Sequence, residues 1–441
     1  MKIAEYARKA LEVLEAKGFE AYIVGGSVRD LLLGKEPYDY DICTDALPEQ
    51  TLDAFSQYAC FTPGMKHGTV AVILDGHQLE ITTYRTEGGY LNHRSPESVT
   101  FVSCLDEDLS RRDFTINSMC ISKDGDVIDR FGGLSDLNAS TIRAIGNPEK
   151  RFTEDALRIM RALRFSAQLR FAIEDRTADA MDKCRYLLND ISAERKFSEL
   201  KKIICGENAF DVLMKHRNII SQIVPEAARA FDYNQYSKHH CYDVWEHTCR
   251  ALSNIEPNET LRLAMLYHDL GKPHVAVTDK KGFKHFHGHM NVSAQIAKAS
   301  LSELRCDKKA MNEIVELVKH HDVRFEAERI TVRRFISEHG WDFFNKYMKI
   351  RYADTMAQSD YMREEKLKIL DKIMKVSEEI RNSNDCLFLN ELAINGDDAI
   401  SLGYSGKDIA KCLSFALNSV IEDECENEKS ALLTYIKENF N

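Results

Sequence analysis

The chain has 441 residues, of which 44% are hydrophobic and 29% charged, with only 8 Pro and 21 Gly. At about 150 residues per domain this length predicts roughly three domains, and the composition is that of an ordered, helix-rich protein, which excludes a disordered one. The 59 basic and 70 acidic residues give a formal net charge of −11, which argues against a nucleic-acid partner unless one local face is basic.

The composition of the chain also bears on its location. The N-terminus mixes charged and apolar residues at helical spacing, unlike a signal peptide, and no stretch reaches the roughly 20 apolar residues of a membrane span. The 12 Cys are scattered without a C-x-x-C pair, which is typical of reduced thiols. We therefore expect a cytoplasmic protein.

The first part of the chain alternates helical and β-rich patterns. A helix is expected at 3–17, and strands at 21–24, 69–74, 78–83 and 127–129. After the breaker Gly146-Asn147-Pro148 the pattern is helical to the C-terminus. The expected fold class is α+β, with a small mixed α/β head at 1–146 and an all-α remainder that we divide into 147–225, 226–360 and 361–441.

Two glycines, Gly25 and Gly26, lead from the strand at 21–24 into a helix expected at 28–33. Glycine lets the backbone approach a ligand closely, and the N-terminus of a helix offers N–H groups to a phosphate. Taken alone, the pattern is equally typical of a plain strand–turn–helix connection.

Paired carboxylates follow the glycine turn. Asp39 and Asp41 stand at i and i+2, so on a strand both point to the same face, where like charges favour a bound cation such as Mg²⁺. Glu80, between the apolar Leu79 and Ile81, is expected to be a buried third acid on a neighbouring strand. An isolated D-x-D is most often a solvated loop, but three acids on adjacent strands are typical of two-metal nucleotidyl transfer.

Two later segments carry groups suited to a nucleotide. Residues 111–118, R-R-D-F-T-I-N-S, supply arginine, Thr and Asn donors for a triphosphate and a ribose. Asp155 and Arg158 stand at i and i+3 of an expected helix, so they would share a face and present an acceptor and a two-pronged donor to a base. The alternative for this pair is an ordinary surface ion pair.

These motifs, with R-F-T-E-D-A-L-R-I-M-R-A-L-R-F at 151–165, occur in this order over about residues 20–205 and resemble the bacterial class II tRNA nucleotidyltransferase and poly(A) polymerase family. The resemblance implies a polymerase-beta-like palm that adds CCA to the 3′ end of tRNA, without a template, from CTP and ATP. A poly(A) polymerase, or an enzyme that adds only part of CCA, shares these motifs and stays an alternative. The segment 192–200 carries less arginine than the family's next helical motif.

The resemblance also suggests roles for individual residues. Asp39 and Asp41 would hold Mg²⁺, and with Glu80 they form the expected catalytic set. Asp155 and Arg158 would favour C or A over G and U at the base edge. The residues expected to bind the nucleotide are Gly25, Gly26, Arg29, Arg111, Asp113, Asn117, Asp155, Arg158, Arg161 and Arg164.

Histidines and aspartates recur in the helical region, and such ligands on several helices predict a metal site. The pair His268-Asp269 resembles the HD phosphohydrolase superfamily, which implies a divalent metal, with Mg, Mn, Ni or Fe as candidates, that activates water against a phosphoester. The ligands so implied are His247, His268, Asp269 and Asp354, with His289 and either His320 or His321 for a second metal. A domain that only binds RNA is the alternative.

Two further points concern the whole chain. The turn Gly403-x-x-Gly406 before a helix resembles the family's tRNA-binding tail, although an ordinary capped turn explains it equally well. An HD phosphohydrolase with a non-catalytic head is a different class of function, and the intact Asp39, Asp41 and Arg111 argue against it. The expected partners are tRNA, ATP and CTP.

Overall fold

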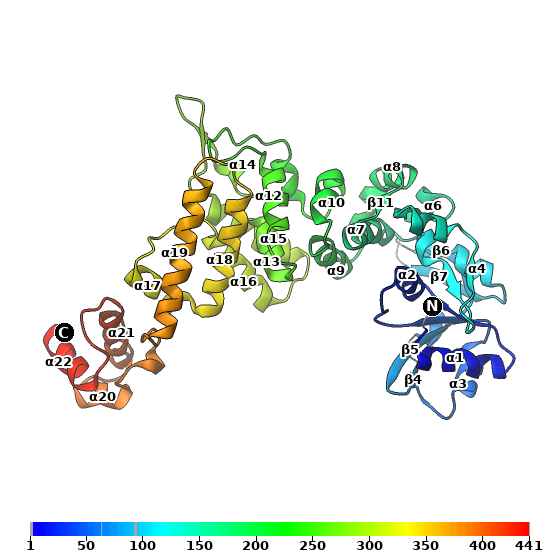
Figure 1. The fold of residues 1–441 in the computed structure, drawn as a ribbon, viewed down its shortest axis with the longest axis horizontal. Helices are drawn as coiled ribbons and strands as arrows, with labels where there is room; N and C mark the ends of the chain where they lie inside the picture. Colours follow the sequence, from blue (N-terminus) through cyan, green and yellow to red (C-terminus); the bar gives the residue numbers. More distant parts are fainter. Residues whose placement is uncertain (1–2, 63, 92–94, 441) are drawn as a thin grey trace. The chain divides into compact units, whose positions relative to one another are not determined.

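The computed structural model of the chain describes residues 3–62, 64–91 and 95–440, with no side chain described for 89–97. The chain forms two compact units, one of Met1–Ala228 with Glu303–Cys306 and one of Arg229–Ser302 with Asp307–Asn441. Figure 1 shows the sheet in the blue and cyan part of the chain and helices in the green to red part. No helix among the described residues is long and apolar enough to cross a membrane.

A mixed sheet, seven-stranded over the described residues, forms the base of the first unit in the order β3-β4-β5-β2-β1-β8-β9. Its strands are β1 (Ala21–Val24), β2 (Asp41–Thr44), β3 (Ala59–Phe61), β4 (Thr69–Leu74), β5 (His77–Thr83), β8 (Met119–Ile121) and β9 (Val127–Asp129). Only β2 and β5 pair in parallel; every other neighbouring pair is antiparallel. The register places Asp41 between Val24 and Glu80, so the glycine turn and the acids meet at one end of the sheet.

The strands expected from the sequence are confirmed. Their buried residues alternate or run continuously along the strand, as in β4 and β5. A hairpin of β6 (Arg85–Leu91) and β7 (Ser95–Phe101) was not expected, since its sequence carries Gly, Pro and charges in place of an apolar alternation. The expectation of only helices after Gly146 was also wrong in detail. The short strand β11 (Ala172–Ile173) pairs with β10 (Thr141–Ile142), and β12 (Val277–Thr278) pairs with β13 (Lys284–His285).

Helices cover and extend the sheet in the first unit, and α7 packs on α9 and α10. The α-helices are α1 (Glu5–Ala16), α2 (Gly26–Leu32), α3 (Pro48–Ala54), α4 (Leu105–Ser110), α5 (Gly133–Asn138), α6 (Pro148–Glu154), α7 (Leu157–Leu169), α8 (Asp175–Cys184), α9 (Ala193–Ile204), α10 (Ala209–Lys215) and α11 (Arg217–Ile220). Short 3₁₀ helices are η1 (Met65–His67), η2 (Thr115–Asn117), η3 (Arg185–Asp190) and η4 (Pro225–Ala230). The α+β fold class is thereby confirmed.

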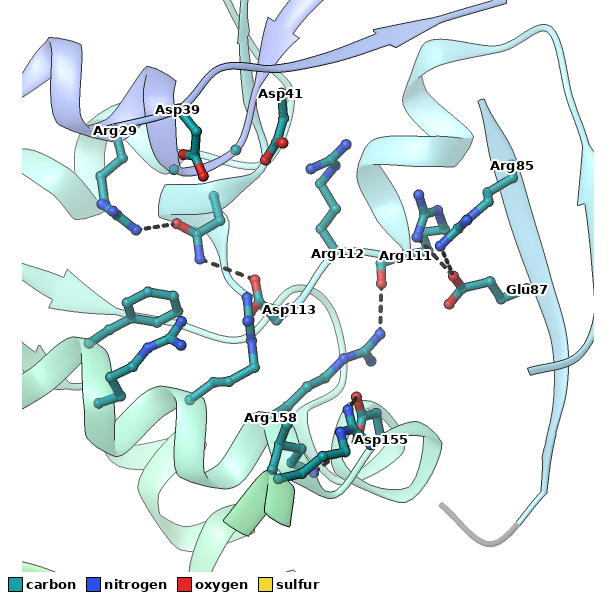
Figure 2. Close-up of a pocket in the computed structure, with 18 residues that line it drawn as sticks. Arg29, Asp39, Asp41, Arg85, Glu87, Arg111, Arg112, Asp113, Asp155 and Arg158 are labelled. Atoms are coloured by element: carbon teal, nitrogen blue, oxygen red, sulfur yellow. Dashed lines mark hydrogen bonds and ion pairs between the residues drawn. The ribbon is translucent and has the colours of Figure 1, made fainter. Parts of the chain in front are cut away.

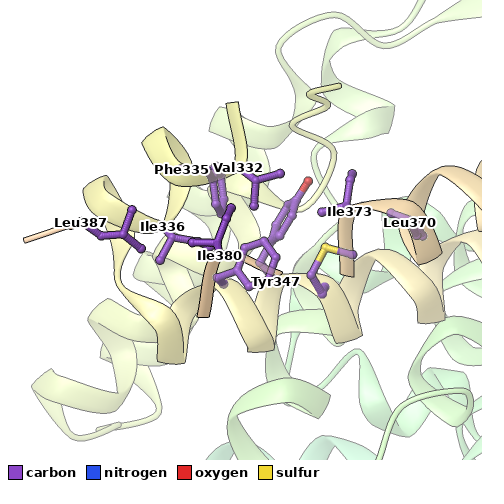
Figure 3. Close-up of a cluster of buried hydrophobic side chains, with 10 residues drawn as sticks. Val332, Phe335, Ile336, Tyr347, Leu370, Ile373, Ile380 and Leu387 are labelled. Atoms are coloured by element: carbon purple, nitrogen blue, oxygen red, sulfur yellow. The ribbon is translucent and has the colours of Figure 1, made fainter. Parts of the chain in front are cut away.

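The second unit is built almost entirely of helices. They are α12 (Val244–Ser253), α13 (Glu259–Tyr267), α14 (Lys272–Val275), α15 (His289–Glu303), α16 (Lys308–His320), α17 (Arg329–His339), α18 (Trp341–Met356), α19 (Arg363–Asn382), η5 (Leu389–Glu391), α20 (Gly396–Ser401), α21 (Lys407–Ile421) and α22 (Lys429–Asn439). Buried apolar side chains of α17, α18 and α19 form one core, among them Phe335, Tyr347 and Ile373 (Figure 3). A second core, which includes Ala399, Cys412 and Ile436, joins α20, α21 and α22.

Candidate functional sites

A cavity of about 650 Å³ opens beside the glycine turn and the paired acids (Figure 2). Among the described residues, eight arginines and five acids line it, so the local charge is basic although the net charge is −11. The lining residues are Gly25, Gly26, Arg29, Asp39, Asp41, Arg85, Glu87, Arg111, Arg112, Asp113, Asn117, Asp155, Leu157, Arg158, Arg161, Arg164, Phe165 and Arg195. Apart from Glu80, every residue expected for the head site lies here.

Gly25 has a backbone conformation that requires glycine. Its φ is +81°, in the left-handed region, and it precedes the first residue of α2. A Cβ at this position would lie 3.5 Å from Nη1 of Arg112 and 3.8 Å from Oδ2 of Asp41. The glycine therefore keeps the space between a guanidinium and a carboxylate open toward the cavity.

The carboxylates of Asp39 and Asp41 both point into the cavity in Figure 2. Asp41 is the first residue of β2, whereas Asp39 precedes the strand. Burial, and then the charges of Asp39 and Glu80, raise the pKa of Asp41 to about 6, against the opposing effect of Arg112. Crowded carboxylate oxygens of this kind are the donors that hard divalent cations prefer, so the residues fit such an ion.

Glu80 differs from the expectation of a buried acid. It lies next to Asp41 in the register of β2 and β5, but its side chain is exposed and, among the described side chains, it is outside the cavity lining. Its neighbours Leu79 and Ile81 are buried because they point to the opposite face of β5. Apolar flanks on a strand therefore placed Glu80 on the solvent face.

The arginines of the 111–118 segment are held by acids beneath the cavity. Nη2 of Arg112 lies 3.0 Å from Asp108, and Nη2 of Arg111 lies 2.8 Å from the same buried carboxylate. Burial acts to lower the pKa of Arg112, but the charge of Asp108 outweighs it and raises that pKa. Arg111 also contacts Glu87, at 2.9 Å, which in turn contacts Arg85 on β6. These ion pairs connect the hairpin β6–β7 to Arg111 in the wall of the cavity.

A chain of hydrogen bonds crosses the cavity floor from α2 to α7. Nη1 of Arg29 donates to the side-chain oxygen of Asn117 at 2.9 Å, and Nδ2 of Asn117 donates to Asp113 at 3.2 Å. Nε of Arg161 donates to the other Asp113 oxygen at 2.7 Å. Burial opposes ionisation of Asp113, yet Arg161 prevails and lowers the pKa of the carboxyl group. The ring of Phe165 packs 4.5 Å from the guanidinium carbon of Arg164.

The expectation that Asp155 and Arg158 share a face of one helix was wrong. Helix α6 ends at Glu154, and Asp155 has an extended backbone with φ −135° and ψ 103° before α7 begins at Leu157. A helix boundary separates the two residues, and local hydrogen bonds hold Asp155 at the start of α7: the N–H of Leu157 donates to its Oδ1 at 3.0 Å and the N–H of Arg158 to its backbone oxygen at 3.1 Å. Both still line the same cavity.

Each member of this pair has protein partners. Oδ2 of Asp155 accepts a hydrogen bond from Arg195 of α9 at 3.2 Å. Nη1 of Arg158 donates to Glu154 at 2.7 Å, and its Nη2 donates to the backbone oxygen of Arg111 at 2.9 Å. Sequence reasoning counted Arg112 among the donors of 111–118 without naming it individually as a site residue, and it did not select Arg85, Glu87 or Arg195. The signals available for two of them were the position of Arg112 beside Arg111 and the E-R pair at 194–195.

In the second unit, six buried side chains of the described chain converge in two groups that could each hold a metal ion. The first group is His247, His268 and Asp354, and the second is Asp269, His289 and His321; within each group the ligand atoms lie within 4.8 Å of one another. Nε2 of His247 is 2.9 Å from Asp354, and Nε2 of His289 is 3.4 Å from Asp269. His247, His289 and Asp354 lie on α12, α15 and α18, whereas His268 and Asp269 follow the end of α13 and His321 follows the end of α16.

The four histidines of the two groups are oriented in the same way. Nδ1 of each ring lies within hydrogen-bond distance of a backbone carbonyl, at 3.2 Å for His247, 2.7 Å for His268, 2.9 Å for His289 and 2.7 Å for His321. A proton on Nδ1 leaves Nε2 free to bind a metal, which is the usual arrangement around metal-bound histidine. The geometry therefore fits two divalent cations.

His320, expected as an alternative to His321, lies outside this cluster. Its Nδ1 lies 2.8 Å from the backbone oxygen of Glu316, and its ring packs on His339 at 4.7 Å. Consecutive residues at the end of α16 point in directions roughly 100° apart, so only one of them can face the cluster. The second group uses His321, and the expectation for His320 was wrong.

A second cavity, of about 430 Å³, opens onto the metal-binding groups. Four of its lining residues, Lys272, Lys284, Arg324 and Lys366, are Lys or Arg. Nζ of Lys272 lies 2.6 Å from Asp269. Cations around two candidate metal positions suit a ligand that carries a phosphate.

Three segments of the chain match family models. Residues 21–143 match the poly A polymerase head domain, residues 170–231 the probable RNA and SrmB-binding site of polymerase A, and residues 238–382 the HD domain. The CCA-adding enzyme of Streptococcus thermophilus is 31% identical over 439 residues, which cover 98% of this chain and 96% of that enzyme. The chain belongs to the CCA-adding enzyme family.

Other CCA-adding enzymes align over shorter segments. That of Lactobacillus helveticus is 48% identical over 225 residues, so the alignment spans 50% of this chain and 55% of that enzyme. Among solved structures, the Bacillus stearothermophilus CCA-adding enzyme in complex with CTP has a TM-score of 0.74 and 29% identity, with 98% of this chain and 96% of that chain covered. The Thermotoga maritima CCA-adding enzyme complexed with tRNA shares the fold, with a TM-score of 0.59 at 22% identity.

Proposed function

We propose that this member of the CCA-adding enzyme family adds CCA to the 3′ end of tRNA from CTP and ATP, in the cytoplasm and without a nucleic-acid template. The observation that carries the proposal is the basic cavity in which Asp39 and Asp41 face a ring of arginines. The likeness to a relative that binds CTP, over nearly the whole of both chains, supports the choice of substrate.

The residues of the first cavity have the following proposed roles. Asp39 and Asp41 would hold Mg²⁺, which when bound lowers the pKa of the RNA 3′-hydroxyl and neutralises the departing pyrophosphate. Gly25, Gly26 and Arg29 contact the triphosphate, where the guanidinium offsets the phosphate charge. Arg111, Asp113 and Asn117 orient the ribose, Asp155 and Arg158 read the base edge, and Arg161 and Arg164 extend the basic wall.

The same proposal assigns tasks to four regions. Residues 1–146 are the transferase head, 147–225 the neck with the base-selecting residues, 226–360 the HD region, and 361–441 an RNA-binding tail. The cavity lining supports the first two assignments, because residues from both regions contribute to it. The glycine turn at Gly403 and Gly406, which precedes α21, supports the tail assignment.

Incubating the protein with Mg²⁺ and a tRNA that lacks its CCA end tests this function. We expect two C residues from CTP, one A from ATP, and no further addition. Asp39→Ala should reduce incorporation at least 1,000-fold, on the scale of removed catalytic groups, whereas Asp75→Ala, which removes an exposed acid paired with Lys9, should be active. Long A-tails would instead identify a poly(A) polymerase, and an active Asp39→Ala protein would contradict the assignment.

As a second function we propose hydrolysis of a phosphoester at the HD centre. The specific observation in its favour is the pair of buried three-ligand groups beneath a cavity with four basic side chains. A divalent metal bound there supplies Lewis-acid activation of water. The side chains of Lys272, Lys366 and Arg324 would bind the phosphate oxygens and orient the phosphorus toward the two groups.

Metal analysis provides a matched test of this centre. His321→Ala removes one proposed ligand, while His320→Ala removes the neighbouring histidine that faces away from the cluster. We expect His321→Ala to lose the metal of the second group and hydrolysis of p-nitrophenyl phosphate, and His320→Ala to keep both. Equal metal content in the two variants would contradict the proposal that His321 binds a metal ion.

A further inference from the structure

Two exposed aromatic rings lie beside residues that line the HD cavity. Tyr236 and Tyr361 expose 58% and 47% of their surface, although large aromatic side chains are mostly buried in a folded chain. The Tyr361 ring lies 5.1 Å from the ring of His239, which lines the cavity. The Tyr236 ring lies 5.1 Å from Nζ of Lys284, another lining residue. Exposed rings beside a phosphate-sized cavity are suited to stack on nucleic-acid bases.

Lysines alternate with these rings. Nζ of Lys238 lies 6.0 Å from the Tyr361 ring, and Nζ of Lys284 lies 3.9 Å from the ring of Tyr233. Lys280 and Lys281 are exposed in the turn between β12 and β13, on the same hairpin as Lys284. Figure 1 shows this hairpin extending from the helices near α14. Cations interleaved with aromatic rings are typical of surfaces that bind single-stranded nucleic acid.

Two acids near the mouth are paired. Asp322 contacts Arg324 and Arg351, each at 2.9 Å, and Asp279 contacts His285 at 3.0 Å. Burial, and then the charge of Arg324, lower the pKa of Lys366, against the opposing charges of Asp354 and Asp322. A bound phosphate would favour the charged form of Lys366.

We propose that the rim formed by Tyr236, Lys238, Lys284 and Tyr361 binds a single-stranded RNA end and presents its terminal phosphate to the HD centre. This proposal rests on the hydrolase function proposed above. Two separate rings and the lysines of the hairpin provide more contacts than one base and one phosphate can use, which favours a chain end over a free nucleotide. In the reaction, a water oxygen bonds to phosphorus, the bond from phosphorus to the ribose oxygen breaks, and RNA with a free hydroxyl and inorganic phosphate leave.

The rim is tested by comparing a substrate that has bases with one that has none. The substrates are ribonucleotide hexamers phosphorylated at the 3′ or the 5′ end, the corresponding phosphorylated mononucleotides, and p-nitrophenyl phosphate. Tyr361→Ala should lower kcat/KM for the better hexamer about 5- to 100-fold, the range for loss of one base stack, and leave p-nitrophenyl phosphate hydrolysis unchanged. Tyr361→Phe, which keeps the ring, and Tyr186→Ala, which removes a more exposed tyrosine of the first unit, should match the parent protein.

An equal loss on all substrates, or no loss on the hexamer, would overturn the role of the rim. A mononucleotide hydrolysed as efficiently as the hexamer would overturn the preference for an RNA end and identify a free nucleotide as the substrate. Each comparison uses the full chain with its metal.

Photocrosslinking separates failure of the rim from failure of the hydrolase. A hexamer with 4-thiouridine at its phosphorylated end should crosslink to the peptides that contain Tyr236 or Tyr361, and Tyr361→Ala should weaken the crosslink. If the protein hydrolyses none of these substrates but the crosslink forms at the rim, the hydrolase proposal fails and RNA binding stands. Crosslinks confined to the first unit would overturn the rim itself.

Discussion

At the scale of single residues, Asp155 is held as a charged acceptor. Its Oδ1 accepts from the backbone N–H of Leu157 at 3.0 Å and its Oδ2 from Arg195 at 3.2 Å. A carboxylate fixed in this way can accept hydrogen bonds but cannot donate them. Cytosine and adenine both present an amino donor on the edge used in base pairing, whereas guanine and uracil present a carbonyl oxygen at the corresponding position. In the proposed role, an acceptor at residue 155 would therefore favour C and A over G and U.

Asp155→Asn should weaken this selection, because the amide adds a donor that can pair with a carbonyl oxygen. We expect the ratio of kcat/KM for UTP to that for CTP to rise about 10-fold or more, since a matched base-edge contact is worth about 1–3 kcal/mol. Single-nucleotide incorporation into tRNA lacking CCA measures the ratio. Glu149→Gln, which changes an exposed acid of α6 that pairs with Lys183, should leave it unchanged. An unaltered ratio in Asp155→Asn would contradict the proposed role.

At the scale of elements, a glycine sets how closely two helices of the HD centre approach. Gly271 lies between α13 and α14, and a Cβ there would be 2.5 Å from the backbone oxygen of His289 and 2.6 Å from the backbone nitrogen of Ser293. Its own N–H donates to Oγ of Ser293 at 2.9 Å. The first turn of α15 thus packs directly on Gly271, and this contact places His289 opposite Asp269.

Gly271→Ala should push the start of α15 away, because backbone atoms at 2.5 Å cannot accommodate a methyl group. We expect loss of the metal held by Asp269, His289 and His321, seen as a fall of about half in metal bound per chain when two ions are present. Gly396→Ala is the control, since its Cβ would meet only Ile409 at an ordinary 3.8 Å. Full metal content in Gly271→Ala would show that this helix contact does not position the ligands.

At the scale of the whole molecule, the two candidate sites are each contained within one compact unit. The residues of the first cavity all belong to Met1–Ala228, and those of the HD cavity belong to the second unit. Sites that share no residue are expected to respond independently to substitution. The net charge of −11 likewise does not predict the local charge of either cavity, because arginines line the first cavity and lysines and an arginine line the second.

Combining substitutions tests this independence. Asp39→Ala should leave the transition-metal content of the HD centre unchanged, and His268→Ala should leave CTP incorporation within about twofold of the parent protein, the scale of additivity for distant sites. The double variant should show both losses and nothing further. A change in CTP incorporation well beyond twofold in the folded His268→Ala protein would reveal coupling between the units.

The sequence by itself determined the local elements and the chemistry they carry. Strands such as β1, β4 and β9 follow from short-range apolar patterns, and the glycine turn, the Asp39–Asp41 pair and the His268-Asp269 pair are motifs of a few residues. Such features depend on backbone geometry within one or two turns or strand residues, so they can be recognised without knowing the fold.

The tertiary structure alone decided which side chains meet. It ended α6 before Asp155 and chose His321 over His320. It also brought Arg195 to Asp155 across 40 residues of chain. The physical reason is that contacts of this kind depend on how helices and strands pack, and that packing is a cooperative result of burying apolar surface across the whole unit, which no local pattern contains.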